Sequence, residues 1–354
     1  MIAVALLATL ASPFWNDLGP GKYDVGFRVM YARDHRHPWS ASADRPIRIS
    51  VWYPASASTT PRMTYGEYLH HDGPADFQTF NEQLDKMDAE SWLSDLHELV
   101  PDAEETYKRV LALPTAAHRD APLARGHFPL VLFSGGKASR ADANIELAEY
   151  LASHGYVVGT VPQLGPSDQQ LELGSSAKEI SLHADDFDAA LTALHALSRI
   201  DFDRVATGGH SAGGEVAAEL AMRHPEVKVV FGLDASYGMT SGARIFRELP
   251  EYDPKRRVNA ALLDLRRANG PQGVKLDFTA IDALHWSQRS REEFAGAYHG
   301  DFTEWGMVAY IVGIPMPKDM TDHTRALGHQ VNVRACKAVL RFLDAHLTHT
   351  PRRG

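Results

Sequence analysis

The chain has 354 residues, of which 44% are hydrophobic and 23% are charged, which is the composition of a globular protein with one large core. Its 36 Lys and Arg residues against 45 Asp and Glu residues leave a formal charge of −9 and no dense basic stretch, which argues against nucleic acid as a partner. The single cysteine, Cys336, excludes an internal disulfide, and no Cys/His cluster has zinc-ligand spacing, so we expect no metal.

The N-terminus is an apolar run over residues 1–11 that ends in small residues before Ser12 and Pro13. The run resembles a signal-peptide core with its cleavage site, but it lacks a basic start and is too short to span a membrane. An apolar segment packed on the body, or a mis-assigned start codon, is the alternative. We therefore treat residues 1–21 as a possible signal peptide or extension and residues 22–354 as one domain. The pattern favours a secreted or periplasmic protein over a cytoplasmic one.

Two strands are predicted near the start of that domain, over residues 23–31 and 46–54. In the second, Ile47, Ile49 and Val51 alternate with less apolar residues, which is the period of a strand with one buried face. The polar stretch between them, residues 32–45, is rich in His and Pro and is predicted to be a loop. The two strands are therefore expected to pair in antiparallel fashion.

Residues 55–127 differ in character from the rest of the chain. A Ser/Thr/Ala-rich loop is followed by acidic, helix-forming segments over residues 76–99 and 102–113, and then by a linker rich in Pro, Ala and His. Apolar residues in the first segment recur at the spacing of an amphipathic helix. We interpret residues 55–127 as a helical insertion or cap within the domain. A peripheral decoration with no part in catalysis is equally compatible with the pattern.

From residue 128 onward, apolar strands alternate with helices. Such alternation predicts a mostly parallel, doubly wound α/β sheet with catalytic groups at the carboxyl ends of its strands. The closing helix contains Cys336, which is expected to be a buried, inert thiol. Strands are predicted over residues 129–133, 155–161, 205–206, 227–233, 258–265 and 293–297, and helices over residues 144–153, 180–197, from 215 onward and over 331–347.

A G-x-S-x-G sequence over residues 209–213 places Ser211 where a strand turns sharply into a helix. This arrangement is typical of a nucleophile elbow, in which the serine adopts a strained conformation and small neighbours are needed for close packing. The helix N-terminus also directs free N–H groups at the place where an oxyanion would form. We predict that Ser211 is a nucleophile. The alternative, a glycine-rich turn with an incidental serine, fits the strand and helix context less well.

A serine nucleophile needs a histidine to take its proton and a carboxylate to orient that histidine. In this type of fold the acid follows the serine, at the end of a later strand. Asp234 closes the apolar run over residues 229–233, and Asp264 lies within the next predicted strand. Because an aspartate at a strand end is often a turn or capping residue, these positions leave the choice of acid open.

The histidine is expected in a loop after the last strand. His299 lies in such a stretch, over residues 294–302, among small residues that would let a loop approach the site. Its position puts it ahead of His285, His323 and His329, of which His329 is the most credible rival because it just precedes the closing helix.

An oxyanion needs preorganised donors. One is expected to be the N–H of Ala212, directly after the nucleophile, and the other to come from the turn at Gly135 and Gly136. Losing one such donor typically costs about 3 kcal/mol of transition-state stabilisation. A simple tight turn at these glycines is compatible with that role.

Several stretches in order resemble the platelet-activating-factor acetylhydrolase-like branch of the α/β-hydrolases, especially its bacterial, dienelactone-hydrolase-related members. The likeness spans roughly residues 22–345, and the insertion at 55–127 matches least. The stretches that carry it are residues 25–28, 51–54, 133–136, 147–158, the elbow, 232–235, 296–302 and 338–343.

This resemblance implies Ser211 as nucleophile, Asp234 as the acid in a Leu-Asp-Ala setting and His299 as the base in a Gly-x-x-His setting. It also implies that the N–H of Lys137 is the second oxyanion donor, beside Gly136. The chain departs from the branch at Gly135, where its members usually carry histidine. Dienelactone hydrolases proper use a cysteine nucleophile, so Ser211 argues against that activity.

These observations predict a serine carboxylic-ester hydrolase that needs no cofactor. The resemblance implies short-acyl or oxidised phospholipid-like esters and a role in lipid degradation. Trp286, Phe302 and Trp305 lie near the proposed base and are candidates for the walls of an acyl pocket, although aromatic residues at such spacing are as often core. A peptidase or amidase acting on small substrates, and a hydrolase-fold protein that binds a ligand without turning it over, are the alternatives.

Overall fold

The computed structural model of the protein describes residues 17–41, 43–70, 72–137, 143–172, 174, 176–269, 275–317, 320 and 323–347. The apolar run over residues 1–11 lies outside this part of the chain. Within the described ranges, no helix is both long enough and apolar enough to cross a membrane.

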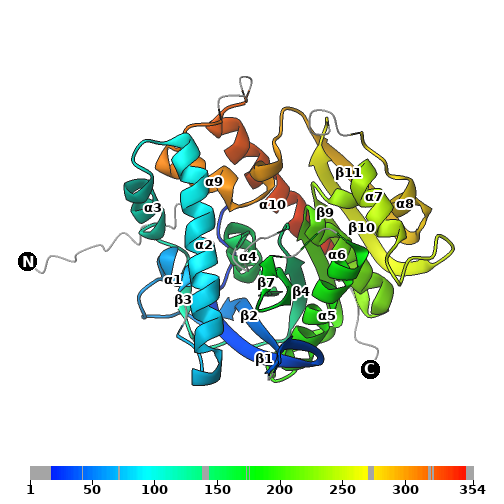
Figure 1. The fold of residues 1–354 in the computed structure, drawn as a ribbon, viewed down its shortest axis with the longest axis horizontal. Coiled ribbons are helices and arrows are strands. Elements are labelled where there is room, and N and C mark those ends of the chain that lie inside the picture. Colours follow the sequence, from blue (N-terminus) through cyan, green and yellow to red (C-terminus); the bar gives the residue numbers. More distant parts are fainter. Residues whose placement is uncertain are drawn as a thin grey trace, which may run out of the picture.

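A mixed sheet lies at the centre of the molecule (Figure 1). In the described part of the chain it has nine strands in the order β11-β10-β9-β8-β4-β5-β2-β1-β3. The neighbours from β5 to β11 run parallel, whereas β2 is antiparallel to both β1 and β5. The strands are β1 (Asp24–Ser40), β2 (Ala43–Ala55), β3 (Ala117–Arg119), β4 (Phe128–Ser134), β5 (Val157–Thr160), β8 (Ile200–His210), β9 (Val227–Leu233), β10 (Arg257–Arg267) and β11 (His285–Phe294).

Helices bury both faces of this sheet, as the uninterrupted apolar runs of its central strands require. In β4, Val131 and Phe133 join a core cluster with α4 (Ile145–Ser153) and α10 (Arg325–Leu347). Leu130 and Leu132 point the other way, into a cluster with α5 (Ala177–Leu194) and α6 (Ala212–Arg223). The predicted doubly wound α/β fold with an antiparallel N-terminal strand pair is therefore confirmed.

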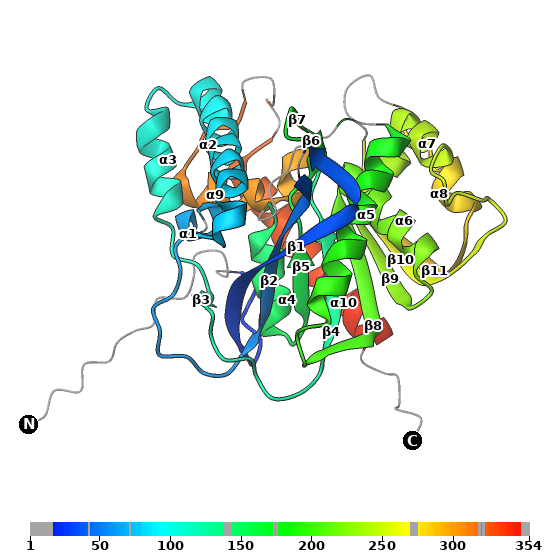
Figure 2. The same cartoon turned by 60° about the horizontal axis from the view of Figure 1, so that its bottom comes forward.

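The stretch over residues 55–127 packs directly on this body. It contains α1 (Gly66–Leu69), a short 3-10 helix η2 (Ala75–Phe77), α2 (Gln78–Leu99) and α3 (Ala103–Leu111), and it ends by adding β3 to the sheet beside β1. In both views α2 and α3, drawn in cyan and teal, stand beside the orange helix α9 (Glu304–Val312) (Figures 1 and 2). The contact between α2 and α9 includes the rings of Trp92 and Trp305, whose centroids are 5.5 Å apart.

The predicted loop over residues 32–45 is wrong, because β1 and β2 continue through most of it. Its polar side chains suggested a loop, but several are bonded within the fold. Arg45 is fully buried and pairs with Asp186 of α5 at 2.5 Å. A buried ion pair thus supports a hairpin end that has few apolar residues.

The prediction of the last strand over residues 293–297 is also wrong, because β11 spans His285–Phe294. Most of its side chains are polar and exposed, which is common at the edge of a sheet and hides the apolar period of a strand. The short helices α7 (Thr240–Arg247) and α8 (Thr279–Ala283), the helix α9 and the small β6–β7 ribbon (Leu164–Ser167 and Gln170–Glu172) had no sequence prediction.

Candidate active site

Ser211 lies at the junction between β8 and α6, with φ 53° and ψ −123°. A positive φ is strained for any residue with a side chain, so the surroundings must hold it in place. They do so by close packing: a Cβ at Gly209 would lie 2.0 Å from the carbonyl oxygen of Gly213. A Cβ at Gly213 would lie 2.1 Å from the carbonyl oxygen of Ser134, at the end of β4. Glycine is therefore required at both positions for the turn to form.

Asp234 and His299 meet across the end of the sheet. His299 begins a short 3-10 helix, η4 (His299–Phe302), and its Nδ1 lies 2.6 Å from Oδ2 of Asp234, which directly follows β9. Asp234 is buried, whereas the side chain of His299 is about one-third exposed (32%). An Nδ1–H that donates to a carboxylate leaves Nε2 of the same ring to accept a proton from another group.

The cationic side chain of Arg267 also contacts Asp234. Nε of Arg267, at the end of β10, lies 2.6 Å from Oδ2 of Asp234, and its backbone N–H donates to Oδ1 at 3.2 Å. Burial favours a raised pKa for Asp234, but the hydrogen bond from His299 and the charges of His299 and Arg267 outweigh it and lower the pKa to about 2. The carboxylate is therefore ionised at neutral pH. The sequence offered no signal for Arg267 beyond its place on the strand next to β9.

The backbone ties Ser211 to the turn that carries Asp234. The N–H of Ser211 donates to the carbonyl oxygen of Leu233 at 3.1 Å, and the N–H of Ser236 donates to the carbonyl oxygen of Ser211 at 2.9 Å. Oγ of Ser211 lies 3.4 Å from Oγ of Ser236, its hydrogen-bond partner in this structure. The elbow is thus bonded to the turn that carries Asp234, and Oγ of Ser211 bonds to Ser236 rather than to His299 in this structure. Ser236 is a contact that the sequence analysis missed.

His210 links the elbow to the histidine loop. Its Nε2 donates to the carbonyl oxygen of His299 at 3.1 Å, and the two imidazole rings have centroids 4.3 Å apart. Burial, followed by the nearby charge of His299, lowers the pKa of His210 to about 3. A neutral ring therefore packs against His299 and bonds to its backbone, which restricts the position of that residue.

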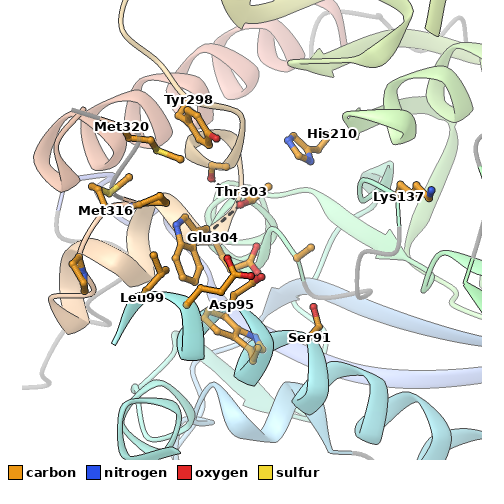
Figure 3. A pocket seen from close by; sticks show the side chains of 17 residues that line it. Ser91, Asp95, Leu99, Lys137, His210, Tyr298, Thr303, Glu304, Met316 and Met320 are labelled. Carbon is orange, nitrogen blue, oxygen red and sulfur yellow. Dashed lines mark hydrogen bonds between the residues drawn. The ribbon is translucent and has the colours of Figure 1, made fainter. Parts of the chain in front are cut away.

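A cavity of about 860 Å³ opens beside His210 and Lys137 (Figure 3). Its other walls come from α2, from residues 298–305 and from the chain that follows α9. Trp92, Leu99, Trp305, Met316 and Met320 supply apolar surface, and Asp95, Glu98 and Glu304 supply carboxylates. The helical insertion therefore borders a cavity whose wall includes His210, Tyr298 and Gly300, the sequence neighbours of Ser211 and His299, although Ser211, Asp234 and His299 are not among its lining residues.

The three aromatic residues considered for an acyl pocket occupy different places. Trp305 lines the cavity. Phe302 is 1% exposed and packs edge-on against Phe294 in the core, so its ring is not part of the described cavity wall. Trp286 lies on the edge strand β11 and donates its indole N–H to the carbonyl oxygen of Ile281 at 2.9 Å.

Comparisons with known proteins agree with this architecture. A chlorophyllase family profile matches residues 99–256, which is less than half of the chain. A ferulic acid esterase from Streptomyces cinnamoneus is structurally similar, with a TM-score of 0.66 and 19% sequence identity over 95% of this chain and 94% of that chain. The protein has the α/β-hydrolase fold.

Two further comparisons add little to this result. A dienelactone hydrolase-like promiscuous phosphotriesterase from metagenomic libraries covers 91% of this chain and 99% of its own, with 13% identity and a TM-score of 0.46. That similarity is too low to support an argument about function. No curated protein sequence shows a significant match to the chain.

The expected oxyanion loop follows β4 and abuts the elbow. Ala212 is the first residue of α6, Gly136 is buried, and Lys137 is exposed on the cavity. Gln163, which is 2% exposed, donates from Nε2 to the carbonyl oxygen of Gly135 at 3.2 Å. A side chain from beyond β5 thus supports the turn at Gly135, the position at which the sequence resemblance leads to the expectation of histidine.

The rival site residues are engaged elsewhere in the fold. Asp264 is buried, with Oδ2 3.2 Å from Nε of Arg266 and 2.7 Å from Nε of Arg291. Nε2 of His329 lies 2.7 Å from Oδ2 of Asp17. His285 begins the exposed edge strand β11, and His323 pairs with Asp301.

No metal or reactive thiol accompanies this site within the described residues. They contain no group of three or more His, Cys, Asp or Glu side chains arranged to hold a metal ion. Cys336 is buried in α10, where burial raises the pKa of its thiol well above the usual value. A buried, protonated thiol is a poor nucleophile.

Proposed function

We propose that this α/β-hydrolase is a serine carboxylic-ester hydrolase that works through an acyl-enzyme, with Ser211, His299 and Asp234 as its triad. The observation that carries the proposal is the 2.6 Å contact between Nδ1 of His299 and Asp234, beside a serine held at φ 53°. Along the chain the serine comes first, the aspartate second and the histidine third, which is the order typical of this fold.

In the proposed reaction, Oγ of Ser211 attacks the ester carbonyl carbon and its proton passes to Nε2 of His299. Asp234 stabilises the imidazolium that results. The N–H groups of Ala212 and Lys137, with Gly136 shaping the loop, would receive the oxyanion. His299 then protonates the departing alcohol oxygen. A water molecule that gives its proton to His299 releases the acid and restores Ser211, so the cycle needs no cofactor.

The cavity suggests the substrate class. Its space of about 860 Å³ suits a small ester, and the paired indoles of Trp92 and Trp305 suit an apolar acyl group. Short-acyl or platelet-activating-factor-like esters, expected from the sequence resemblance, fit this space. The name of the Streptomyces neighbour, a ferulic acid esterase, agrees with ester chemistry.

A first experiment tests the reaction class. The purified protein should hydrolyse p-nitrophenyl acetate or butyrate and react with a fluorophosphonate probe. If it does neither, the proposal fails. Matched ester and amide substrates should be cleaved at very different rates, with the ester faster; comparable rates would favour an amidase, which the same triad could serve.

Trp305 is expected to determine acyl preference. Truncation of Trp305 to alanine removes apolar surface from the cavity wall, which is worth about 1–3 kcal/mol to a group that packs there. We expect kcat/KM for p-nitrophenyl octanoate or an aryl-acyl ester to fall about 5- to 100-fold, and that for acetate to change little. Trp286→Ala is the matched control, because that indole lies on the edge strand. Equal losses for acetate and octanoate would rule out a role in acyl selection.

Gln163 is expected to support the oxyanion loop. Gln163→Leu keeps most of the side-chain volume but removes the hydrogen bond to the carbonyl oxygen of Gly135. Because a displaced oxyanion donor acts mainly on the transition state, kcat should fall about tenfold or more with little change in KM. Steady-state kinetics would measure this, with Gln288→Leu on the exposed strand β11 as the control. An unchanged kcat would contradict the role.

A further inference from the structure

Beside the proposed triad, a second histidine–carboxylate pair joins the His299 loop to the chain just before α10. Nε2 of His323 lies 3.0 Å from Oδ1 of Asp301, and Nδ1 of the same ring lies 3.1 Å from the carbonyl oxygen of Gly296. The other carboxylate oxygen of Asp301 accepts the N–H of Tyr298 at 2.6 Å. These contacts bracket His299, with Gly296 and Tyr298 before it and Asp301 after it.

The hydrogen-bond partners fix the number of protons in this pair. A carbonyl oxygen can only accept, so Nδ1 of His323 must carry a proton to bond to Gly296. A proton must then also lie between Nε2 and Asp301, either on the ring or on the carboxyl group. In both arrangements the pair holds one proton more than a neutral imidazole beside a free carboxylate.

The pair lies in a buried environment that favours the protonated form of Asp301. The side chains of His323 and Asp301 are 7% and 2% exposed. Burial raises the pKa of Asp301 more than the Tyr298 N–H, His323 and the charge of Arg267 lower it. The ring of Tyr298 lies 6.1 Å from that of His323. Loss of the proton would turn an Nε2 lone pair toward the carboxylate and break the contact.

The first turn of α10 closes over the pair. A Cβ at Gly328 would lie 2.6 Å from Oδ1 of Asp301 and 3.3 Å from Nε2 of His323. Glycine is therefore needed for the helix to approach this closely. The same approach shields the pair from water, which strengthens its electrostatic interaction.

We propose that His323 is a positioning residue for His299. Hydrogen bonds from both of its ring nitrogens restrict the movement of residues 296–301, so that His299 stays in contact with Asp234. This role rests on the proposed function of His299 as the base. His323 does not act on the substrate itself, since both of its nitrogens are occupied by Gly296 and Asp301. The hydrogen bonds of His323 also connect the His299 loop to the chain segment that carries Met316 and Met320 on the cavity wall.

The His323→Asn substitution removes the two hydrogen bonds of the imidazole ring while keeping a polar side chain. Because small displacements of a reacting group can cost up to about 10²-fold in rate, kcat for p-nitrophenyl butyrate should fall about 10- to 100-fold. KM should stay within about threefold, since the cavity wall remains. Gly328→Ala, which pushes on the pair without removing it, should lower kcat in the same way but less.

His35→Asn is the matched control, because His35 also contacts a carboxylate, Asp44 at 2.6 Å, but is 78% exposed on the β1–β2 hairpin. It should leave kcat and KM unchanged. A readout independent of turnover is nitrogen NMR of the His323 ring, assigned with the variant, which should show both nitrogens bonded as the proton count requires. A His323 ring with one nitrogen free of a hydrogen bond, or a His323→Asn variant with wild-type kcat, would overturn the proposal. Wild-type protein with no esterase activity would instead remove the proposed function.

Discussion

Replacement of Ser211 by alanine is expected to reduce ester hydrolysis by at least about 10³-fold and to abolish labelling by a fluorophosphonate. The reason is that no other group at the elbow could form the acyl-enzyme with Asp234 and His299 in their present positions. The fold should survive, because Oγ of Ser211 makes one long hydrogen bond, 3.4 Å to Ser236. The free energy of unfolding should therefore change by less than about 1 kcal/mol. Initial rates, probe labelling and a urea titration would measure the three quantities.

Ser236→Ala supplies the matched control for this experiment. Its hydroxyl is close enough to Ser211 to be mistaken for the nucleophile, yet it lies outside the strained turn. We expect the Ser236 variant to retain probe labelling at Ser211 and most of its activity. The opposite pattern, an active Ser211→Ala protein and an inactive Ser236→Ala protein, would move the nucleophile to Ser236.

The body of the fold could be predicted because its signals are local. Each central strand is apolar on both faces, as the division of Leu130 and Leu132 from Val131 and Phe133 between two core clusters shows. The strand–turn–helix context of Ser211 follows from the same kind of pattern, since only glycine fits at Gly209 and Gly213. Periodicity and steric requirements are properties of neighbouring residues, so they can be read without knowledge of the tertiary structure.

The partners of Ser211 were harder to choose from position in the chain. Asp234 directly follows β9 and Asp264 lies within the neighbouring strand β10, so only the partners of the two carboxylates distinguish them. Asp264 pairs with Arg266 and Arg291, whereas Asp234 reaches His299. The sequence resemblance pointed to Asp234 before any geometry was known.

Other parts of the site depend on tertiary contacts that leave no local signal. Gln163, which follows β5, bonds to Gly135 in the proposed oxyanion loop, and Arg267 at the end of β10 contacts Asp234. Likewise, Trp92 meets Trp305 across more than 200 residues of sequence, which is how the insertion comes to border the cavity. The role of that insertion could not be decided from its composition, because an amphipathic helix has the same pattern whichever surface it covers.

Asp234→Asn is expected to lower kcat about 10⁴-fold, the size of loss seen when a triad carboxylate becomes an amide. The carboxylate can only accept, so it fixes the proton of His299 on Nδ1 and leaves Nε2 as the base. An amide can present its N–H₂ group to Nδ1 instead, and Nε2 would then carry the proton and be unable to take one from Ser211. Steady-state kinetics on p-nitrophenyl butyrate would measure the loss.

The same substitution should affect stability in a pH-dependent way. The pKa of Asp234 is lowered to about 2, below the unfolded value of about 3.9, so its ionised form stabilises the fold above pH 4. That contribution is lost as the pH falls from about 4 toward 2. The variant, which also leaves Arg267 buried without its partner carboxylate, should be several kcal/mol less stable than wild type at neutral pH, on the order of 3–5 kcal/mol. The difference should shrink across that acid range.

Asp264→Asn separates the catalytic loss from the structural one. It also removes a buried carboxylate from arginine partners, Arg266 and Arg291, so it should destabilise the protein to a similar extent. Its folded fraction should nevertheless keep kcat within about tenfold of wild type, because Asp264 does not contact His299 in this structure. If instead the Asp264 variant loses 10⁴-fold and the Asp234 variant stays active, the acid of the triad is Asp264 and the contact between Asp234 and His299 is structural.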